Sequence, residues 1–475
     1  MSSNESINMK EEIKLARNLS PVNVWAMALG CIIGWGAFVM PGDVFLRQGG
    51  PLGSAIAIGI ASLLMIVISL NYAYMINKFP VAGGEFYYTQ KAFGERHAVF
   101  CAWFLVMTYI TAVPLNATAL GFIAKNLLPE GISLGKGYTV AEYDVKAGEI
   151  IIAISAIIIF AVLSIRGVKL AGIFQTALIG ALVIGVVVIA GTAIVSPKAS
   201  FSNLSPGFRP EMGKLKGILM VATVAPWAFA GFDTIPQAAE EISFSQRKTR
   251  ILMILAIVFG ASVYIILNTV TAMTVPEQFD SWVSYVDGIR KDRGVIALPT
   301  FYSAKVLLGE TGVVFLSLSV LAAILSGIVG FYMATSRLLY SMSHAGTLPE
   351  WFGSLHPKYR TPHHAILFIA VISMGAPFFG RTVLGWIVDM SSIGAAIGYG
   401  YTSMATLIYS IREKNMKYIL TGIMGSFFSL LFVFLLIVPI PQLGCSLSKQ
   451  SYFCLIIWAI LGFVFYKRTK SKMTY

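Results

Sequence analysis

Residues 22–45 read VNVWAMALGCIIGWGAFVMPGDVF, an apolar run long enough to cross a bilayer and interrupted near its centre by Gly30, Gly34 and Gly36. Hydrocarbon offers no hydrogen-bond partners, so an exposed backbone polar group there costs several kcal/mol. A break at mid-depth is tolerated only where the freed N–H and C=O groups face protein, water or a ligand. This stretch therefore predicts a broken membrane helix with a binding site at its break.

The composition of the whole chain also indicates a membrane protein. Of its 475 residues, 57% are hydrophobic and 12% are charged, and the mean hydropathy is +0.77. A soluble domain carries about 25% charged residues. Repeated apolar runs of membrane-crossing length predict an all-α polytopic membrane protein with twelve transmembrane helices. The expected spans are 22–45, 51–77, 96–125, 148–165, 171–195, 217–240, 249–274, 311–339, 363–380, 383–410, 417–439 and 450–467.

The basic residues indicate which loops face the cytoplasm. With the N-terminus inside, most of the 35 Lys and Arg fall in the tails and the even-numbered loops. The positive-inside rule then predicts cytoplasmic tails at 1–20 and 468–475 around a transporter domain at 21–467. We expect a multi-pass protein of the cell membrane, with the lipid bilayer as its surroundings and its first span retained. The net charge of +13 is spread between apolar spans, which argues against a nucleic-acid partner.

The sixth expected span carries a second break. Residues 217–242 contain Pro226, the pair Ala230-Gly231, the acid Asp233 and then Pro236. This segment is five spans after the first, and an odd difference in span number reverses its direction across the membrane. Broken helices at corresponding places in two oppositely oriented halves are typical of an inverted repeat with substrate bound at the midplane. We therefore expect a first repeat at about 22–195, a second at about 217–410 and two extra helices at about 417–467.

Two broken helices offer both partners that a zwitterion needs. Half-helix N-termini present free N–H groups and a positive dipole end, which suit a carboxylate. Half-helix C-termini present carbonyls, which suit an ammonium group. An α-amino acid carries both groups on one carbon. The chain contains no P-loop or HExxH signature, so an ATP-driven pump and a metalloprotease of that class are not expected.

Metal and cofactor sites are not expected either. The four cysteines fit no metal spacing and are predicted to be reduced thiols, although Cys445 and Cys454 lie near one membrane face and could pair. The five histidines form no ligand set. Two segments lie off the spans: 78–95 is expected to be a short interfacial or re-entrant segment on the cytoplasmic side, and 293–308 an amphipathic helix on the outer face.

At the two breaks the chain resembles the amino acid–polyamine–organocation family of secondary transporters. Three collinear motifs carry the resemblance, which extends over roughly residues 20–465. They are Gly30-Cys31-Ile32-Ile33-Gly34-Trp35-Gly36-Ala37-Phe38, then Pro80 with Gly83-Gly84, Phe86, Tyr88 and Phe93-Gly94, and then Phe229-Ala230-Gly231-Phe232-Asp233 followed by Glu240-Glu241.

The resemblance implies a leucine-transporter-like 5+5 inverted repeat with two C-terminal helices, and a substrate site at the two breaks. It assigns the substrate carboxylate to the backbone at Gly34, Trp35 and Gly36, and the amino group to the carbonyls of Ile32 and Ala230. An aromatic ring, Trp227 or Phe232, is expected to close over the substrate. The motif neighbours Ile33, Phe229 and Gly231 complete the expected site.

Coupling and gating are assigned to three acids. The resemblance links Asp233 to protonation, with the proton as coupling ion, while a purely structural role leaves its carboxylate on the amides of the break. Glu240 and Glu241 are candidates for a cytoplasmic gate, paired with Arg247 or Lys248, or else form a solvated helix end. The fifth span lacks the Lys that marks some proton-coupled relatives, so exchange and facilitated uptake stay open.

Trp35 departs from the family pattern, which has a small residue there. Facing the cavity, its indole is expected to favour small substrates such as glycine, alanine or serine, or to wall off one flat substrate. Alternatively it packs between helices. Two further side chains are interpreted as interfacial: Asp389 as solvated or capping rather than cavity-facing, and Trp282 as an anchor at the membrane surface.

The favoured function is a secondary active transporter, permease or exchanger, that moves amino acids by alternating access. An amine or polyamine transporter is the alternative, although such substrates would need buried acids, of which the spans offer few. A non-transporting amino acid sensor is a third candidate, but both tails are short. An enzyme is not expected, since no nucleophile–base pair or metal cluster lies within the spans.

Overall fold

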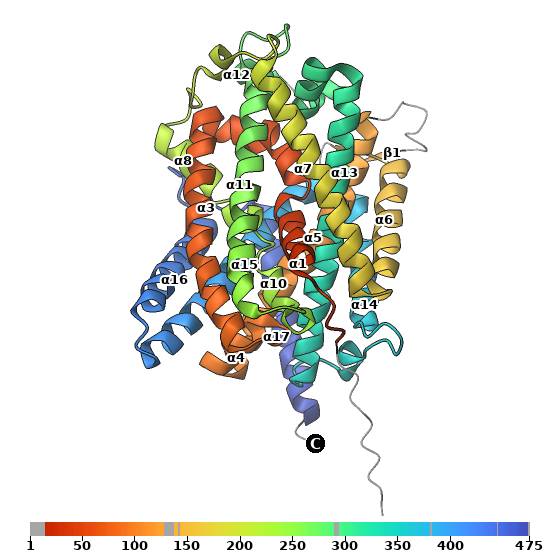
Figure 1. The fold of residues 1–475 in the computed structure, drawn as a ribbon, viewed down its shortest axis with the longest axis vertical. Helices are drawn as coiled ribbons and strands as arrows, with labels where there is room; N and C mark the ends of the chain where they lie inside the picture. The colour runs from red at the N-terminus through yellow and green to blue at the C-terminus, as the bar shows by residue number, and fades with distance from the viewer. Residues whose placement is uncertain are drawn as a thin grey trace, which may run out of the picture.

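The protein is a bundle of helices around the first broken segment (Figure 1). The computed structural model describes residues 15–127, 137–140, 143–288, 294–380, 382–443 and 445–473. The beginning of the expected N-terminal tail and the last two residues lie outside this range. All-α architecture is confirmed, apart from one small hairpin.

The main helices coincide with the expected spans. They are α1 (Pro21–Ile33), α2 (Gly36–Met40), α3 (Leu46–Lys78), α5 (Glu95–Leu127), α6 (Ala147–Ile165), α7 (Val168–Val195), α8 (Lys214–Ala222), α9 (Ala225–Ala228), α10 (Thr234–Gln237), α11 (Thr249–Met273), α13 (Pro299–His344), α14 (His363–Ser373), α15 (Thr382–Arg412), α16 (Met416–Ile437) and α17 (Lys449–Met473). The shorter elements are α4 (Gly84–Phe93), α12 (Trp282–Gly288) and the strands β1 (Gly137–Val140) and β2 (Tyr143–Lys146).

Within the described ranges, nine helical stretches are long and apolar enough to cross a membrane. The stretch from Pro21 to Lys78 is one of them and contains the first two expected spans. The sixth expected span is cut into α8, α9 and α10, and the ninth is the short α14 with the turn at 376–379. A polytopic membrane fold is thus confirmed, while the count of twelve spans stays a prediction.

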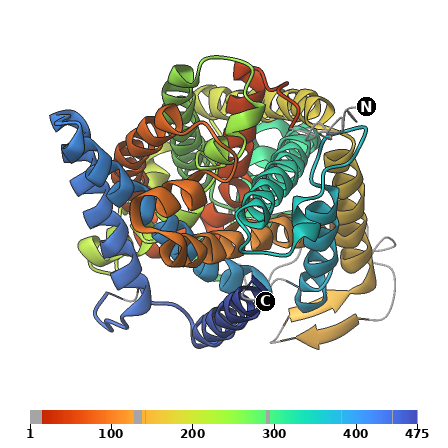
Figure 2. The same cartoon turned by 90° about the horizontal axis from the view of Figure 1, so that it is seen from below.

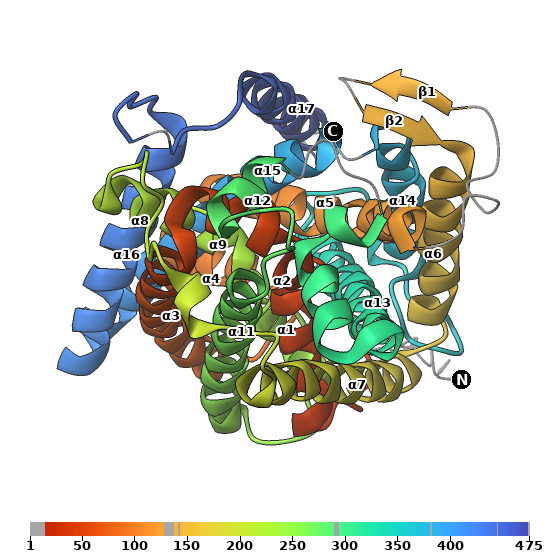
Figure 3. The same ribbon diagram turned by 90° about the horizontal axis from the view of Figure 1, so that it is seen from above.

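The first break falls where the glycines predict it. Ser20 caps α1 by accepting from the Asn23 N–H, and α1 then runs to Ile33. Gly34 has φ 44° and ψ −153°, a conformation that side chains with a Cβ rarely adopt, and the chain restarts at Gly36 in a new direction. Figure 3 shows α1 and α2 in the middle of the bundle, with α11 and α13 on either side.

The second break lies against the first. The chain between α9 and α10 is a turn over residues 229–233, and a Cβ added at Gly231 would lie 2.7 Å from the Ile32 nitrogen and 2.8 Å from the Ala28 oxygen. The backbone of α1 therefore touches the backbone at this turn, which only a glycine permits. The two broken segments form one unit at the centre of the molecule.

The C-terminal helices lie at the rim of the bundle (Figure 2). One contact that holds α17 is a reciprocal pair with α5: Trp103 and Trp458 stack at 4.7 Å, and each indole N–H donates to the other residue's carbonyl at 2.8 and 3.1 Å. On another side, β1 and β2 form an antiparallel hairpin with Gly137 opposite Lys146, which the sequence analysis did not anticipate.

A helix was expected at 293–308 and a short interfacial or re-entrant segment at 78–95, and the structure has a helix within each. In 78–95 the helix is α4, which begins after Gly83 in the left-handed region at φ 88°. In 293–308 the helix is the start of α13, set off from the rest by Gly309 at φ 65°. The interfacial role of Trp282 was wrong, because its side chain is fully buried and its N–H donates to the Pro206 carbonyl at 3.0 Å.

Candidate substrate site

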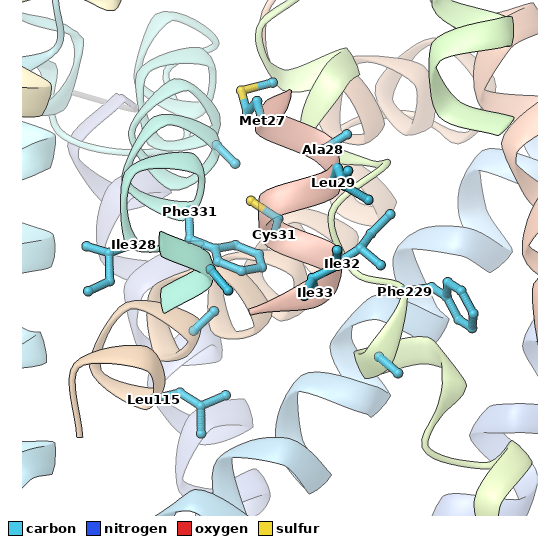
Figure 4. Packing of buried hydrophobic residues seen from close by; sticks show 14 of the residues in the cluster. Met27, Ala28, Leu29, Cys31, Ile32, Ile33, Leu115, Phe229, Ile328 and Phe331 are labelled. Carbon is cyan, nitrogen blue, oxygen red and sulfur yellow. The ribbon is translucent and has the colours of Figure 1, made fainter. Parts of the chain in front are cut away.

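A small cavity lies between the two breaks. Its volume is about 20 Å³, room for about one water molecule. The lining residues come from α1, α2, α5, α9, α11, α13, α15 and the turn after α9: Cys31, Ile32, Ile33, Gly34, Trp35, Gly36, Thr108, Ala112, Leu115, Asn116, Trp227, Ala230, Tyr264, Phe331 and Ser391. Figure 4 shows the end of α1 with Phe331 and Leu115 beside it.

The structure brings seven of the ten expected substrate residues to this cavity. They are Ile32, Ile33, Gly34, Trp35, Gly36, Trp227 and Ala230. Gly231 instead packs on the backbone of α1. Phe229 points away from the end of α1 (Figure 4) and packs near Tyr264. Phe232 is fully buried and stacks on Tyr399 at 5.3 Å, so Trp227, not Phe232, is the ring at the cavity.

Trp35 and Trp227 form an aromatic wall of the cavity. Their ring centroids are 6.0 Å apart and their planes are tilted by 57°. Trp35 is only 5% exposed, and its indole N–H has no hydrogen-bond partner among the described residues. A buried donor without a partner costs free energy unless something polar enters the site. The side chain that departs from the family pattern therefore lines the cavity and leaves one donor open there.

The remaining polar groups of the lining are neutral. Asn116 donates to the Ala112 carbonyl at 2.8 Å, while its amide oxygen is buried and without a partner in the described chain. Thr108 donates to the Ser391 carbonyl at 3.1 Å. The fifteen lining residues include no Asp, Glu, Lys, Arg or His. Any charge on a ligand must therefore be met by backbone dipoles and neutral side chains.

The backbone at the break supplies those dipoles. Gly34 N–H still donates to Gly30 at 3.1 Å, but the first N–H groups of α2 have no preceding turn to bond to. At the end of α1, the Ile32 carbonyl accepts from the Tyr264 hydroxyl at 3.0 Å, which leaves its second lone pair. A Cβ at Gly36 would lie 2.7 Å from the Trp227 ring, so glycine lets this ring approach α2.

Asp233 lies outside the cavity. It is fully buried, and its two oxygens accept from the Gly231 N–H at 2.6 Å and from the Tyr109 hydroxyl at 2.8 Å. The carboxylate thus holds the amide of the break, as its structural interpretation predicts. Its second partner, Tyr109 on α5, was not anticipated, although a Tyr in the middle of an apolar span was a visible signal.

Glu240 and Glu241 do not bind Arg247 or Lys248. Glu241 forms a two-point ion pair with Arg337 of α13, with Nε–Oε1 and Nη2–Oε2 distances of 2.6 and 3.0 Å, and both side chains are buried. Glu240 is exposed and accepts from the Ala82 N–H at 3.0 Å. The sequence analysis did not single out Arg337, which lies at the end of the expected span 311–339.

The end of the expected N-terminal tail packs on the same region. Leu19 is buried, its N–H donates to the Glu241 carbonyl at 2.9 Å, and its carbonyl accepts from the Ser243 N–H at 3.0 Å. Arg17 donates to the Ile242 carbonyl at 2.7 Å.

Asp389 has the capping role: it accepts from the Ser448 N–H and the Ser451 hydroxyl at the start of α17. The four cysteines are free thiols.

Comparison with known proteins identifies the family of the chain. The sequence profile of a family described as amino acid permease matches residues 19–464. A methylthioribose transporter of Bacillus subtilis (strain 168) is 26% identical over 97% of this chain and 95% of its own length. A branched-chain amino acid permease of the same organism is 25% identical over 84% and 80%. A low-affinity putrescine importer of Escherichia coli (strain K12) is 22% identical over 95% and 93%.

Proposed function

This chain belongs to the amino acid permease family and is a transporter, and we propose that it moves small zwitterionic amino acids by alternating access. The observation that carries the proposal is the cavity between the two helix breaks, lined by backbone ends and neutral side chains. Transporters of this architecture bind substrate where discontinuous helices meet near the bilayer midplane. The family and the named relatives are transporters rather than enzymes.

A zwitterion matches the groups that surround this cavity. The free N–H groups at Trp35 and Gly36 suit a carboxylate, since they form the positive end of a helix. The carbonyls of Ile32 and Ala230 suit the ammonium group. The open donor of Trp35 and the open acceptor of Asn116 suit a hydroxyl or a second polar atom of the substrate. Binding must move neighbouring side chains, because the cavity is smaller than any amino acid.

A neutral methylthioribose-like thio-sugar is the second candidate substrate. Aromatic rings and neutral hydrogen-bonding groups recognise such a molecule without charged partners, and the lining has this character. The Bacillus relative that matches almost the whole chain is named for that substrate. A diamine such as putrescine fits less well, because the lining provides no carboxylate to meet a second ammonium group. The relatives named above are transporters, which argues against a sensor that does not transport.

The inverted repeat is part of the same proposal. The repeats would comprise residues 22–195 and 217–410, with 417–467 as extra helices. Support comes from the two broken segments, which lie one against the other and at corresponding places in the two halves. Rocking of one repeat against the other would open the site to each side in turn. Glu241 and Glu240 would hold one side closed.

We place the protein in the cell membrane with both termini in the cytoplasm. The distribution of Lys and Arg supports this orientation. Single cysteines introduced at Arg412 and Lys449, in a variant without the native four, should react with a membrane-impermeant reagent from opposite sides. We expect Lys449→Cys to react from outside and Arg412→Cys only after permeabilisation. Labelling of both from one side would contradict the twelve-span arrangement.

Uptake into proteoliposomes tests the substrate. Labelled glycine, alanine, serine, leucine, putrescine and methylthioribose should be offered one at a time, with and without pH and sodium gradients. Saturable uptake of a small amino acid would support the proposal. Uptake of methylthioribose alone would favour the second candidate, and putrescine alone would point to the amine alternative. No uptake of any of them by folded protein would contradict the proposal.

Trp35 is expected to set the size limit of the substrate. In Trp35→Ser the indole is replaced by a hydroxymethyl group, which enlarges the cavity next to the break. Leucine and phenylalanine should then inhibit uptake of the small substrate at least about tenfold better, since burying an extra side chain contributes roughly 1.5–3 kcal/mol. Trp25→Ser, at a position outside the lining, is the matched control. Identical competition profiles for the wild type and Trp35→Ser would contradict a size limit set by the indole.

A further inference from the structure

Two buried carboxyl groups meet one phenol at the second break, outside the cavity lining. We propose that Glu85 and Asp233 share a single proton through Tyr109, and that this chain of three groups is the proton site of the transporter. Glu85 belongs to the short helix α4, Tyr109 to α5, and Asp233 to the break before α10. The proposal deepens the transport function proposed above and rests on it for its physiological meaning.

The hydrogen bonds impose a direction on the chain. The Tyr109 hydroxyl lies 2.8 Å from Asp233 Oδ2 and 3.4 Å from Glu85 Oε1. A phenol has one proton to donate, and the nearer carboxyl takes it. Tyr109 can then interact favourably with Glu85 only as an acceptor, which requires a proton on the Glu85 carboxyl. The order is Glu85 O–H to Tyr109 O–H to Asp233.

The burial of Glu85 and Asp233 also indicates that the two acids share one proton. The side chains of Glu85, Tyr109 and Asp233 are each 0% exposed. Two bare carboxylates in such a place would each lose their hydration and would also repel each other. Within the described chain neither acid contacts a Lys, Arg or His, and the titratable neighbours that face them carry no positive charge. These are Cys31, Tyr72, Tyr88, Cys101 and Tyr399.

Further polar atoms around Glu85 and Asp233 have no hydrogen-bond partner among the described residues. The Gln237 amide donates to Glu85 Oε2, while its own oxygen is buried and without a partner among the described residues. The hydroxyl of Tyr72 faces Glu85, is fully buried, and makes no hydrogen bond of normal geometry in the described chain. Open donors and acceptors around two acids let the proton change its position without moving the backbone.

A proton shift along the chain would act on the break itself. Glu85 gives its proton to the Tyr109 oxygen, and Tyr109 gives its own proton to Asp233, so that one proton is held before and after. Asp233 then accepts more weakly from the Gly231 N–H, which it holds at 2.6 Å in the turn that touches α1. At the other end α4 packs directly on α10, since a Cβ at Gly84 would lie 2.9 Å from the Pro236 Cβ. The proton position therefore couples α4 to the second break.

Infrared difference spectroscopy of the purified full-length protein in nanodiscs tests the shared proton without any substrate. Across a pH series, the C=O band of a protonated carboxyl should titrate in the wild type. In Glu85→Gln and in Asp233→Asn the remaining acid loses its negative neighbour, so the band should titrate at lower pH. In Tyr109→Phe the band should change frequency. Glu413→Gln, an exposed carboxyl, should leave the band unaltered. An unaltered band in Glu85→Gln or in Asp233→Asn would overturn the shared proton.

Transport supplies the second measurement. With a pH dye enclosed in proteoliposomes and the best substrate of the uptake panel outside, wild type and Glu413→Gln should carry protons in with substrate. Glu85→Gln, Asp233→Asn and Tyr109→Phe should each lose proton entry while substrate-for-substrate exchange stays measurable, which shows that they fold. Substrate uptake without proton entry in the wild type would overturn the coupling role alone. No uptake at all would contradict the proposed transport function and leave the infrared result standing.

Discussion

Gly231→Ala is expected to abolish transport. The added methyl carbon would lie 2.7 Å from the Ile32 nitrogen, 2.8 Å from the Ala28 oxygen and 2.8 Å from the Cys31 Cβ. Two of these are backbone atoms of α1, which cannot turn aside as a side-chain end can. The first broken segment must therefore move away from the second, and the cavity between them loses its shape. Overpacking of this kind costs about 1–3 kcal/mol of stability as well.

Initial rates of substrate uptake, compared at equal amounts of folded protein, measure this effect. Gly180→Ala is the matched control, because a Cβ at this position of α7 meets nothing within 4 Å. That variant should transport like the wild type. Gly231→Ala with the wild-type uptake rate and thermal stability would show that close contact between the two breaks is not required for function.

The two breaks were predictable because each is marked by residues that are close together in the sequence. Gly34 and Gly36 interrupt an apolar run, and Asp233 follows Gly231 inside another. A membrane permits such residues only where the interior can use them, so hydropathy and a few glycines located the two breaks, while the family resemblance supplied the residues expected at the site. For Trp35 the sequence left open whether the indole faces the cavity or packs between helices; the structure places it in the lining, with its N–H unpaired among the described residues.

The partners of these residues could not be predicted, because they come from distant segments. Glu85 was placed in a short interfacial or re-entrant segment, yet α4 carries it inward to Tyr109 and Gln237. In the sequence nothing distinguishes Asn116 from other polar residues within spans, but in the folded protein it lies beside Gly34. The spacing of residues within one segment carries no information on contacts between distant segments. These contacts depend on how α4, α5 and the second break pack together.

The partner of Glu241 was also missed because it comes from a distant segment. Its removal is expected to have a larger effect on stability. Arg337 lies at the end of the expected span 311–339 and was not singled out, yet its side chain is 2% exposed and that of Glu241 is 0% exposed. The hydrogen bonds of Leu19 reach the backbone at Glu241 and Ser243 on the same side. One buried ion pair thus joins α13, the end of the second broken segment and the N-terminal residues.

Arg337→Ala is expected to destabilise the protein by about 3–5 kcal/mol, because it leaves the Glu241 carboxylate buried without a counter-charge. Glu241→Ala should have a similar effect, since among the described residues the Arg337 guanidinium then keeps only its bond to the Ser336 hydroxyl at 2.9 Å. Thermal and denaturant unfolding in a mild detergent measure the loss. If the pair also closes one side of the transporter, the surviving protein should show faster substrate leakage from loaded proteoliposomes.

A second ion pair provides the control for this prediction. Lys78 and Glu413 pair at the surface with side chains 28% and 43% exposed, and hydrogen bonds from Lys78 and Tyr74 lower the pKa of Glu413. Lys78→Ala should cost less than about 1 kcal/mol, as exposed pairs do. The double variant Glu241→Leu with Arg337→Leu removes both buried charges and should be more stable than either alanine variant. Equal losses from Arg337→Ala and Lys78→Ala would show that burial adds nothing to the Glu241–Arg337 pair. In that case the contacts of Leu19, rather than the ion pair, would be what fixes the end of the second broken segment.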